Sequence, residues 1–158
     1  MSQAGVIDSL QFARDRGERR GLLNLDAMPR LADSGCIAAT LNYALQGGES
    51  PEHRPSLHLE VQGQIVLECQ RCLAPLETPV AVEVDLELAH NQAEIDAAED
   101  DADRVLASKH MDIAALVEDE AILALPMIPT HEQCVEIAER SPAQKVSPFA
   151  VLAALKKK

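Results

Sequence analysis

The stretch that decides the fold is Val80-Ala81-Val82-Glu83-Val84-Asp85-Leu86-Glu87-Leu88, in which aliphatic side chains alternate with acidic or small ones. Successive side chains of a β-strand point to opposite faces of the sheet, so a period of two places the aliphatic residues on one face. The carboxylates then lie on the other face. The stretch therefore predicts a strand that is buried on one side and acidic on the other.

Three earlier segments have the same period, and they are Leu41 to Leu45, Leu57 to Val61 and Gln64 to Glu68. Gln62-Gly63 predicts a tight turn that joins the last two as a hairpin, and Pro75 and Pro79 indicate a connection before residue 80. Strands with short links and one polar face are typical of an antiparallel sheet covered on one side. We expect a single α+β domain over residues 1–158, with an antiparallel sheet of four or more strands and packed helices.

The helix expected to cover this sheet runs from Ile113 to Leu125, with Asp112 as its N-cap. Apolar residues recur along it at helical spacing, and Pro126 follows it. The acidic run Glu118-Asp119-Glu120 lies on the same helix. Adjacent helical side chains fan out around the axis, so we interpret the run as a solvated face rather than an acid–base or magnesium site. Glu120, nearest the apolar stripe, is the residue expected to differ.

Three segments lie outside this pattern. Residues 1–34 predict a helical or arm-like segment, with a polar helix or arm over 8–20 and a short helix over 25–32. Residues 90–110, rich in alanine and acids, predict a mobile acidic loop. Residues 147–158 form a basic tail, whose short helix either packs on the sheet as core or enters the groove of a partner.

Three of the four cysteines fall in two motifs, Cys69-x-x-Cys72 and His131-x-x-Cys134. A gap of two residues lets both side chains of a pair point into one turn, as tetrahedral zinc requires. Cys69, Cys72, His131 and Cys134 are therefore the candidate ligands of a zinc ion. Three cytosolic thiols near the sheet edge, with a solvated His131, remain the alternative. Cys36 is interpreted as a small core residue.

A redox function of the Cys69-x-x-Cys72 motif is disfavoured. A thioredoxin-like pair needs the motif to open a helix, because the helix N-terminus lowers the pKa of the first thiol. Here Pro75, Pro79 and a strand follow the motif instead.

Charge and composition limit the classes of partner. The net charge of -12 argues against a generic grip on phosphates, and basic residues gather only near the two ends. The candidate partner-binding residues are Arg16, Arg19 and Arg20 near the start and Phe149, Leu152, Lys156, Lys157 and Lys158 in the tail. No apolar leader or membrane-spanning run is present, so we expect a cytoplasmic protein without a membrane partner.

The sequence contains no phosphate-binding glycine loop, no nucleophile elbow and no zincin helix. We therefore expect a protein without enzymatic activity.

Three blocks of sequence resemble the YceD family of large ribosomal RNA subunit accumulation proteins. They are Leu67 to Cys72, Leu116 to Pro126 and Pro148 to Lys156, in the family's order, with Ser147 where asparagine is expected. The resemblance implies a bacterial cytoplasmic ribosome biogenesis factor that supports accumulation or processing of 23S rRNA without catalysis. Its partner would be the large-subunit rRNA precursor or a ribosomal protein. The alternative is a structural zinc-binding module for protein interaction in another pathway.

Overall fold

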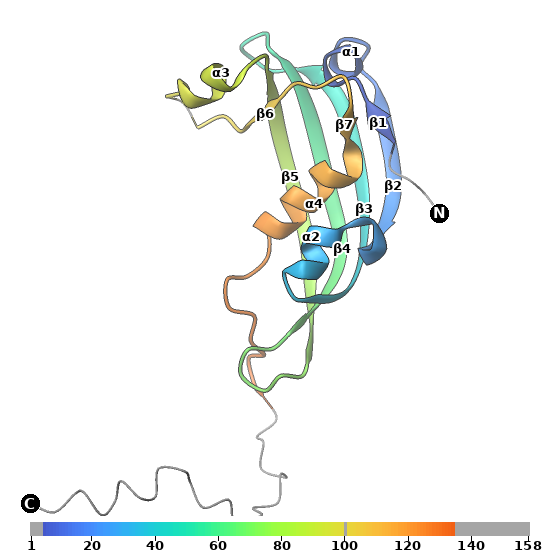
Figure 1. The fold of residues 1–158 in the computed structure, drawn as a ribbon, viewed down its shortest axis with the longest axis vertical. Coiled ribbons are helices and arrows are strands. Elements are labelled where there is room, and N and C mark those ends of the chain that lie inside the picture. Colours follow the sequence, from blue (N-terminus) through green and yellow to red (C-terminus); the bar gives the residue numbers. More distant parts are fainter. Residues whose placement is uncertain (1–4, 100, 135–158) are drawn as a thin grey trace, which may run out of the picture.

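The computed structural model describes residues 5–99 and 101–134, and its centre is one strongly elongated sheet (Figure 1). The strand order is β2-β3-β4-β5-β6, in which all pairs are antiparallel except β5 with β6. A second sheet pairs only the short strands β1 and β7. The strands are β1 (Val6–Ile7), β2 (Glu18–Asn24), β3 (Cys36–Glu49), β4 (Pro55–Glu68), β5 (Pro75–Ala89), β6 (Arg104–Leu106) and β7 (Met111–Asp112). The predicted α+β class with a largely antiparallel sheet is confirmed.

Helices cover one face of this sheet (Figure 1). They are α1 (Ser9–Arg14), the 3-10 turn η1 (Leu25–Ala27), α2 (Pro29–Asp33) and α4 (Ile113–Leu123). The short helix α3 (Gln92–Asp96) lies beside the end of the sheet and buries no residue. Asp112 caps α4 as predicted, because its carboxylate accepts the N–H of Ala114 at 2.9 Å. The helix ends two residues before the predicted Leu125.

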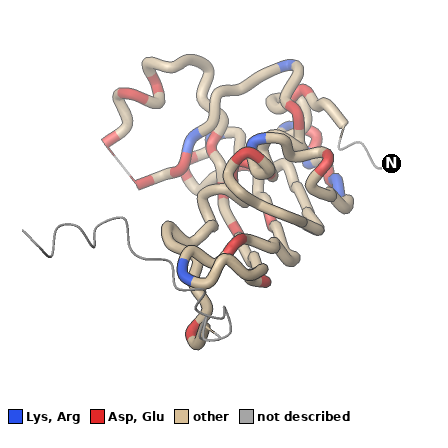
Figure 2. Tube along the Cα trace, turned by 60° about the horizontal axis from the view of Figure 1, so that its bottom comes forward, with Lys and Arg blue, Asp and Glu red and all other residues tan. Residues whose placement is uncertain are grey.

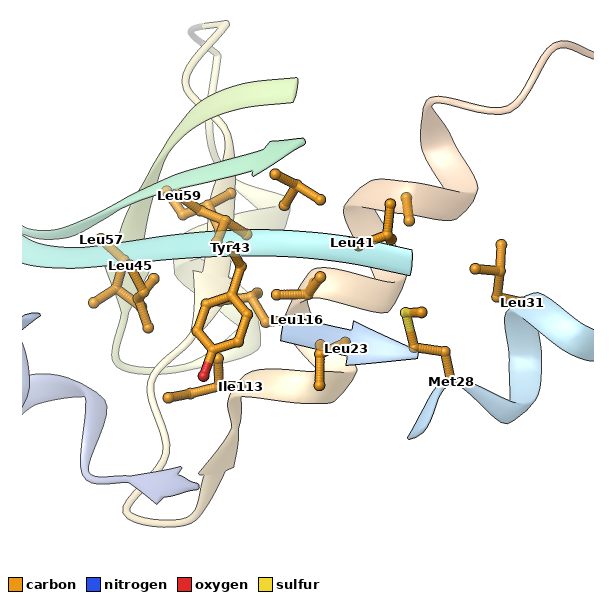
Figure 3. Packing of buried hydrophobic residues seen from close by; sticks show 14 of the residues in the cluster. Leu23, Met28, Leu31, Leu41, Tyr43, Leu45, Leu57, Leu59, Ile113 and Leu116 are labelled. Atoms are coloured by element: carbon orange, nitrogen blue, oxygen red, sulfur yellow. The ribbon is translucent and has the colours of Figure 1, made fainter. Parts of the chain in front are cut away.

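Aliphatic side chains fill the space between the sheet and α4 (Figure 3). The following are fully buried: Leu41, Leu45, Leu57, Leu59, Val61, Ile65, Ile113 and Val117. Each buried leucine or isoleucine contributes about 1.5–3 kcal/mol to folding. Cys36 also lies in this core, in agreement with the prediction. The alternating residues on the opposite side of the strands form a polar face, on which none of the described helices lies.

The predicted turn at Gln62-Gly63 is wrong. Both residues lie inside β4, where Gly63 pairs with Leu41 of β3. A Cβ at Gly63 would collide with the carbonyl of Thr40 and lie 2.9 Å from the Cα of Leu41. The glycine therefore permits close backbone approach within a continuous strand instead of a chain reversal.

The predicted connection at Pro75 and Pro79 is also part of a strand. β5 begins at Pro75, and Pro79 pairs with Gln64. β6 covers only Glu87 to Ala89, so both prolines lie where β5 forms a sheet edge. An edge tolerates proline because no neighbouring strand needs its missing N–H.

The segment 1–34 is less helical than predicted. Residues 18–24, expected in part as a helix or arm, form the edge strand β2, with Arg19 opposite Leu45 of β3. The short helix predicted over 25–32 is present as η1 and α2. Buried and exposed residues do not alternate along β2, because only Leu23 is buried. The strand is therefore defined by its pairing with β3 and not by a period in the sequence.

The segment 90–110 contains regular structure that its composition conceals. It holds α3 and also β6, which pairs in parallel with the end of β5. Ser108 is tied to α1, since its N–H donates to Ser9 Oγ at 2.9 Å and its carbonyl accepts that hydroxyl at 3.1 Å. The residues after 103 therefore form a strand and a packed connection instead of the predicted loop.

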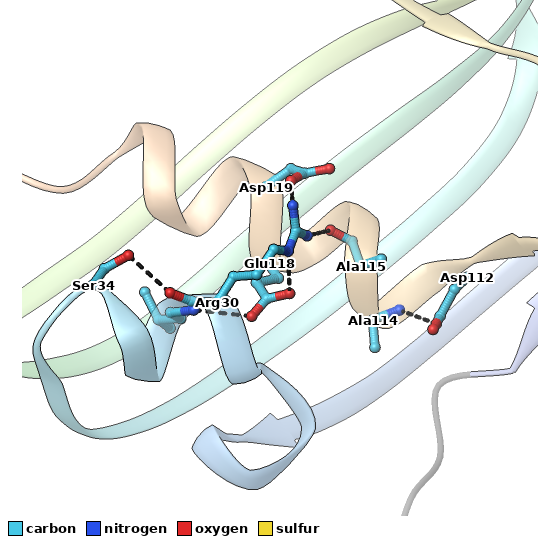
Figure 4. Close-up of polar contacts among 8 residues, drawn as sticks. Arg30, Ser34, Asp112, Ala114, Ala115, Glu118 and Asp119 are labelled. Atoms are coloured by element: carbon cyan, nitrogen blue, oxygen red, sulfur yellow. Dashed lines mark hydrogen bonds and ion pairs between the residues drawn. The ribbon is translucent and has the colours of Figure 1, made fainter.

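The interpretation of Glu118 as part of a solvated face is wrong. Glu118 is 3% exposed and joins α4 to α2 (Figure 4). Its Oε2 accepts Arg30 Nε at 2.9 Å, and its Oε1 accepts the N–H of Leu31 at 2.9 Å. Asp119, which is half exposed, forms an ion pair with the same guanidinium on its solvent side. Glu120 is partly buried. This burial raises the pKa of its carboxyl group, and the negative charges of Asp103 and Asp119 raise it further.

Within the described ranges, no helix has the length and apolar character needed to cross a bilayer.

Candidate metal centre

The connection between β4 and β5 is a tight loop that presents two thiols. Cys69 directly follows β4, donates its N–H to the carbonyl of Ala74 and accepts the N–H of Leu73, both at 2.9 Å. Leu73 has a φ of 62°, a left-handed conformation that reverses the chain. Cys69 is fully buried and Cys72 is half-buried. The loop thus turns both sulfur atoms inward.

The chain that follows α4 returns to this loop (Figure 1). The N–H of Gln70 donates to the carbonyl of Pro129 at 2.8 Å, and the N–H of His131 donates to Cys69 Sγ at 3.4 Å. These contacts place His131 and Cys134 beside the two loop thiols. The second motif therefore meets the first, although 58 residues of strand, loop and helix separate Cys72 from His131.

The four candidate ligand atoms lie within 4.8 Å of one another. Cys69 Sγ is 3.7 Å from Cys134 Sγ, and Cys72 Sγ is 3.4 Å from His131 Nδ1. Zinc bonds of about 2.3 Å to sulfur and about 2.0 Å to nitrogen give tetrahedral edges of about 3.8 Å and about 3.5 Å. Both measured edges match, so the residues fit a metal of this kind.

His131 is oriented by its other ring nitrogen. Nε2 lies 3.1 Å from the carbonyl oxygen of Pro75, which can only accept a hydrogen bond. The proton therefore belongs on Nε2, and Nδ1 keeps its lone pair toward Cys72. Metal-binding histidines are commonly fixed in this way by a backbone carbonyl. No sequence pattern indicates this contact, because the partner atom belongs to the backbone.

The electrostatics of the cluster favour a bound cation. Burial would raise the pKa of Cys69, but backbone N–H groups of Cys72, His131 and Arg71 lower it to about 5. These hydrogen bonds stabilise the thiolate form of Cys69. Burial, together with Cys69 and Cys72, raises the pKa of Cys134. Without a cation, negative charge on Cys69 disfavours a second thiolate at Cys134. A divalent ion among these sulfur atoms would remove this repulsion, since it stabilises each ligand as a thiolate.

The redox alternative lacks its structural requirement. Cys69 ends a strand rather than opening a helix, so no helix dipole acts on it. All four cysteines are free thiols, and Cys36 lies in the core apart from the cluster. The cluster has the composition of a structural metal centre, with three sulfur ligands and one nitrogen.

The candidate partner-binding residues do not gather at this centre. Arg16, Arg19 and Arg20 are exposed, and Arg19 lies over the Phe12 ring at 5.9 Å. Arg19 and Arg20 are neighbours in β2 and therefore point to opposite faces of the sheet. The tail residues Phe149, Leu152, Lys156, Lys157 and Lys158 lie outside the described residues.

Comparison with known proteins places this architecture in a family. The family model described as large ribosomal RNA subunit accumulation protein YceD matches residues 57–156. A Haemophilus influenzae protein named large ribosomal RNA subunit accumulation protein YceD is 28% identical over 166 aligned residues, which cover 97% of this chain and 95% of the relative. No solved structure matches. The matched region includes β4, β5, α4 and both halves of the Cys69-Cys72-His131-Cys134 cluster, and the chain belongs to the YceD family.

Proposed function

We propose that this protein is a non-enzymatic ribosome biogenesis factor that supports the accumulation or processing of 23S rRNA in the bacterial cytoplasm. The observation that carries the proposal is the family match over residues 57–156, together with a relative named for large-subunit rRNA accumulation. The family match covers most of β4, all of β5 and β6, the helix α4 and the cysteine cluster. The relative aligns with 97% of this chain, which supports a function that depends on the whole domain.

We further propose that the Cys69, Cys72, His131 and Cys134 cluster holds a structural zinc ion. Four protein ligands complete a tetrahedral site and leave no position for a reactive water, which is the arrangement of structural rather than catalytic zinc. Bound zinc would join the β4–β5 loop to the chain that follows α4. It would therefore fix the far end of the sheet, which hydrogen bonds to the carbonyls of Pro129 and Pro75 and to Cys69 Sγ also join to this chain segment.

The large-subunit rRNA precursor or a ribosomal protein is the partner that this function requires. Arg16, Arg19 and Arg20 are exposed basic residues along the β2 edge, on both faces of the sheet. The tail residues Phe149, Leu152 and Lys156 to Lys158 would form the second contact. Arginine and lysine can position a phosphate backbone, whereas the apolar residues suit a protein groove.

Depletion of the protein in its native cell, followed by quantification of both ribosomal RNAs, tests this function. We expect a shortage of 23S rRNA relative to small-subunit rRNA, which a plasmid copy restores. A variant with Arg16, Arg19 and Arg20 changed to glutamine should fold normally but restore 23S rRNA poorly. Equal levels of both RNAs after depletion would contradict the proposal.

A structural module for protein interaction is the second candidate function. Leu123, Met127 and Ile128 are 77%, 100% and 71% exposed, and they lie shortly before His131 and Cys134 on the chain. Exposed apolar side chains in one short segment suit a protein contact. Unchanged 23S rRNA after depletion, combined with loss of a protein complex on changing these three residues to serine, would favour this candidate.

A further inference from the structure

One long edge of the main sheet has no neighbouring strand among the described residues. β5 pairs with β4 along its whole length, but β6 covers only Glu87 to Ala89. At the other end, His131 Nε2 donates to the carbonyl of Pro75. Between these two contacts, residues 76–86 of β5 have no strand partner on this side within the part of the chain that the structure describes.

The direction of the backbone groups follows from the contacts at both ends. The N–H of Glu87 donates to Asp103 and the carbonyl of Ala89 accepts from Ala107, so these residues face away from β4. β4 and β5 keep one register from Pro75 to Glu87. The alternate residues Glu77, Pro79, Ala81, Glu83 and Asp85 consequently direct their backbone groups to the open edge. Pro79 has no N–H and falls in this outward-facing set.

Acidic side chains follow the same edge. Glu77, Glu83 and Asp85 are all exposed, and they project from β5 on the face without helices. Across the β4–β5 pair, His58 lies 2.7 Å from Asp85 and 3.6 Å from Glu83, which leaves a net negative charge. Figure 2 shows how few basic residues the chain offers to neutralise its many acids.

A concave acidic pocket lies at the β6 end of the edge. Its volume is about 500 Å³, and acids from three separate segments line it: Glu49, Glu52, Glu83, Asp85, Asp101 and Asp103. Glu87 lies at its wall but is already engaged, 3.2 Å from Arg104 and 4.0 Å from Arg54. The pocket is therefore a strongly anionic hollow into which lysine or arginine side chains fit.

We propose that the β5 edge binds an extended basic segment of a partner protein by strand addition. The segment would pair its backbone with the outward groups of Glu77 to Asp85 and place alternate lysine or arginine side chains beside Glu83, Asp85 and the acidic pocket. Its intervening side chains would lie on the helix-covered face beside Val82 and Val84, which are only partly buried. Backbone pairing supplies affinity, and the charged and apolar alternation supplies specificity.

Charge distinguishes this partner from nucleic acid. Phosphates would be repelled by the carboxylates of the edge, and a nucleic acid has no peptide groups to continue a sheet. The opposite edge of the same sheet, β2, carries Arg19 and Arg20 instead. The two edges therefore serve partners of opposite charge, and the β5 edge extends the proposed function with a protein contact that is separate from the arginines.

A fluorescent peptide of alternating lysine and valine is the probe, with a glutamate–valine peptide as its control. Anisotropy with the full-length protein should show binding of the first peptide only, and added salt should weaken it. Ala81→Pro removes an outward N–H and leaves the β4 ladder intact, as Pro79 already does. We expect this variant to bind about ten-fold more weakly than Ala81→Val, which keeps the N–H.

Charge and location are tested separately. The double variant Glu83→Gln, Asp85→Asn should lose affinity for the lysine peptide but bind a threonine–valine peptide as the wild type does. Hydrogen exchange of the free protein should be fast at the amides of Ala81, Glu83 and Asp85 and slow after peptide addition. Equal binding by Ala81→Pro and Ala81→Val would overturn the proposal. Slow exchange in the free protein would also overturn it, because a second copy or another segment of the chain would then occupy the edge.

Discussion

Replacement of Glu118 tests whether one buried carboxylate holds the N-terminal helices on the sheet. Glu118 is the only acid of the run Glu118-Asp119-Glu120 that is buried, and it accepts hydrogen bonds from Arg30 Nε and Leu31 N at 2.9 Å each. The second bond serves the first turn of α2, whose Met28 cap provides no side-chain acceptor. The carboxylate therefore acts as a distant cap for α2 and also as its ionic link to α4.

The loss of folding free energy on replacing Glu118 is worked out from the groups that lose their hydrogen-bond partners. Glu118→Ala leaves the buried N–H of Leu31 unsatisfied, which costs about 1–3 kcal/mol, and removes a charge-assisted bond to Arg30. We expect a total loss of about 3 kcal/mol and a fall in Tm of about 6–12 °C. Glu118→Gln keeps an acceptor for Leu31 but turns amide hydrogens toward Arg30, so we expect about half that loss.

Urea unfolding followed by circular dichroism measures these differences. Asp119→Ala is the matched control, because Asp119 binds the same arginine on the same helix but is half exposed. A surface pair of this kind contributes about 0–1 kcal/mol. If Glu118→Ala is no less stable than Asp119→Ala, the carboxylate does not support α2 and the reasoning fails.

Three further outcomes are expected. Protein purified without chelator should contain stoichiometric zinc, and Cys69→Ser should remove the metal and melt at a lower temperature, because metal binding adds to folding free energy. The hydrogen bond with Asp85, helped by Glu60 and Glu83, raises the pKa of His58. A raised pKa stabilises the fold fully below the ordinary value of about 6.5 and less as pH rises through the folded pKa, so His58→Gln should destabilise more at acidic than at alkaline pH. Gly63→Ala should cost about 1–3 kcal/mol, because the new Cβ meets the backbone of β3.

Each of these outcomes has a control within the chain. For zinc it is Cys36→Ser, which alters a core thiol outside the cluster and should keep the metal. For His58 it is Asp85→Asn, which removes the carboxylate 2.7 Å from the imidazole and should weaken the pH dependence of the His58→Gln effect. For Gly63 it is Gly48→Ala, where the nearest atom to a Cβ is the Ser56 hydroxyl at 3.8 Å. Metal-free wild-type protein, equal pH profiles or equal glycine effects would contradict the respective predictions.

Local pattern in the sequence was sufficient for the class of fold and for the strands with clear alternation. Val80 to Leu88 and Leu41 to Leu45 lie in β5 and β3 because a period of two allows only one face to be buried. The Asp112 cap and the apolar stripe likewise defined α4. The two cysteine motifs also named the four members of the cluster, since ligand type and spacing are local properties.

Tertiary structure alone decided the features that depend on distant partners. Gln62-Gly63 has the composition of a turn, yet the backbone of Thr40 and Leu41 keeps it extended. Glu118 resembles its exposed neighbours in sequence, and only Arg30 and Leu31, nearly ninety residues earlier on the chain, make its burial favourable. The meeting of the two cysteine motifs depends on the path of the chain after α4. In each case the deciding contact joins residues far apart in sequence, and no local period or propensity records such a contact.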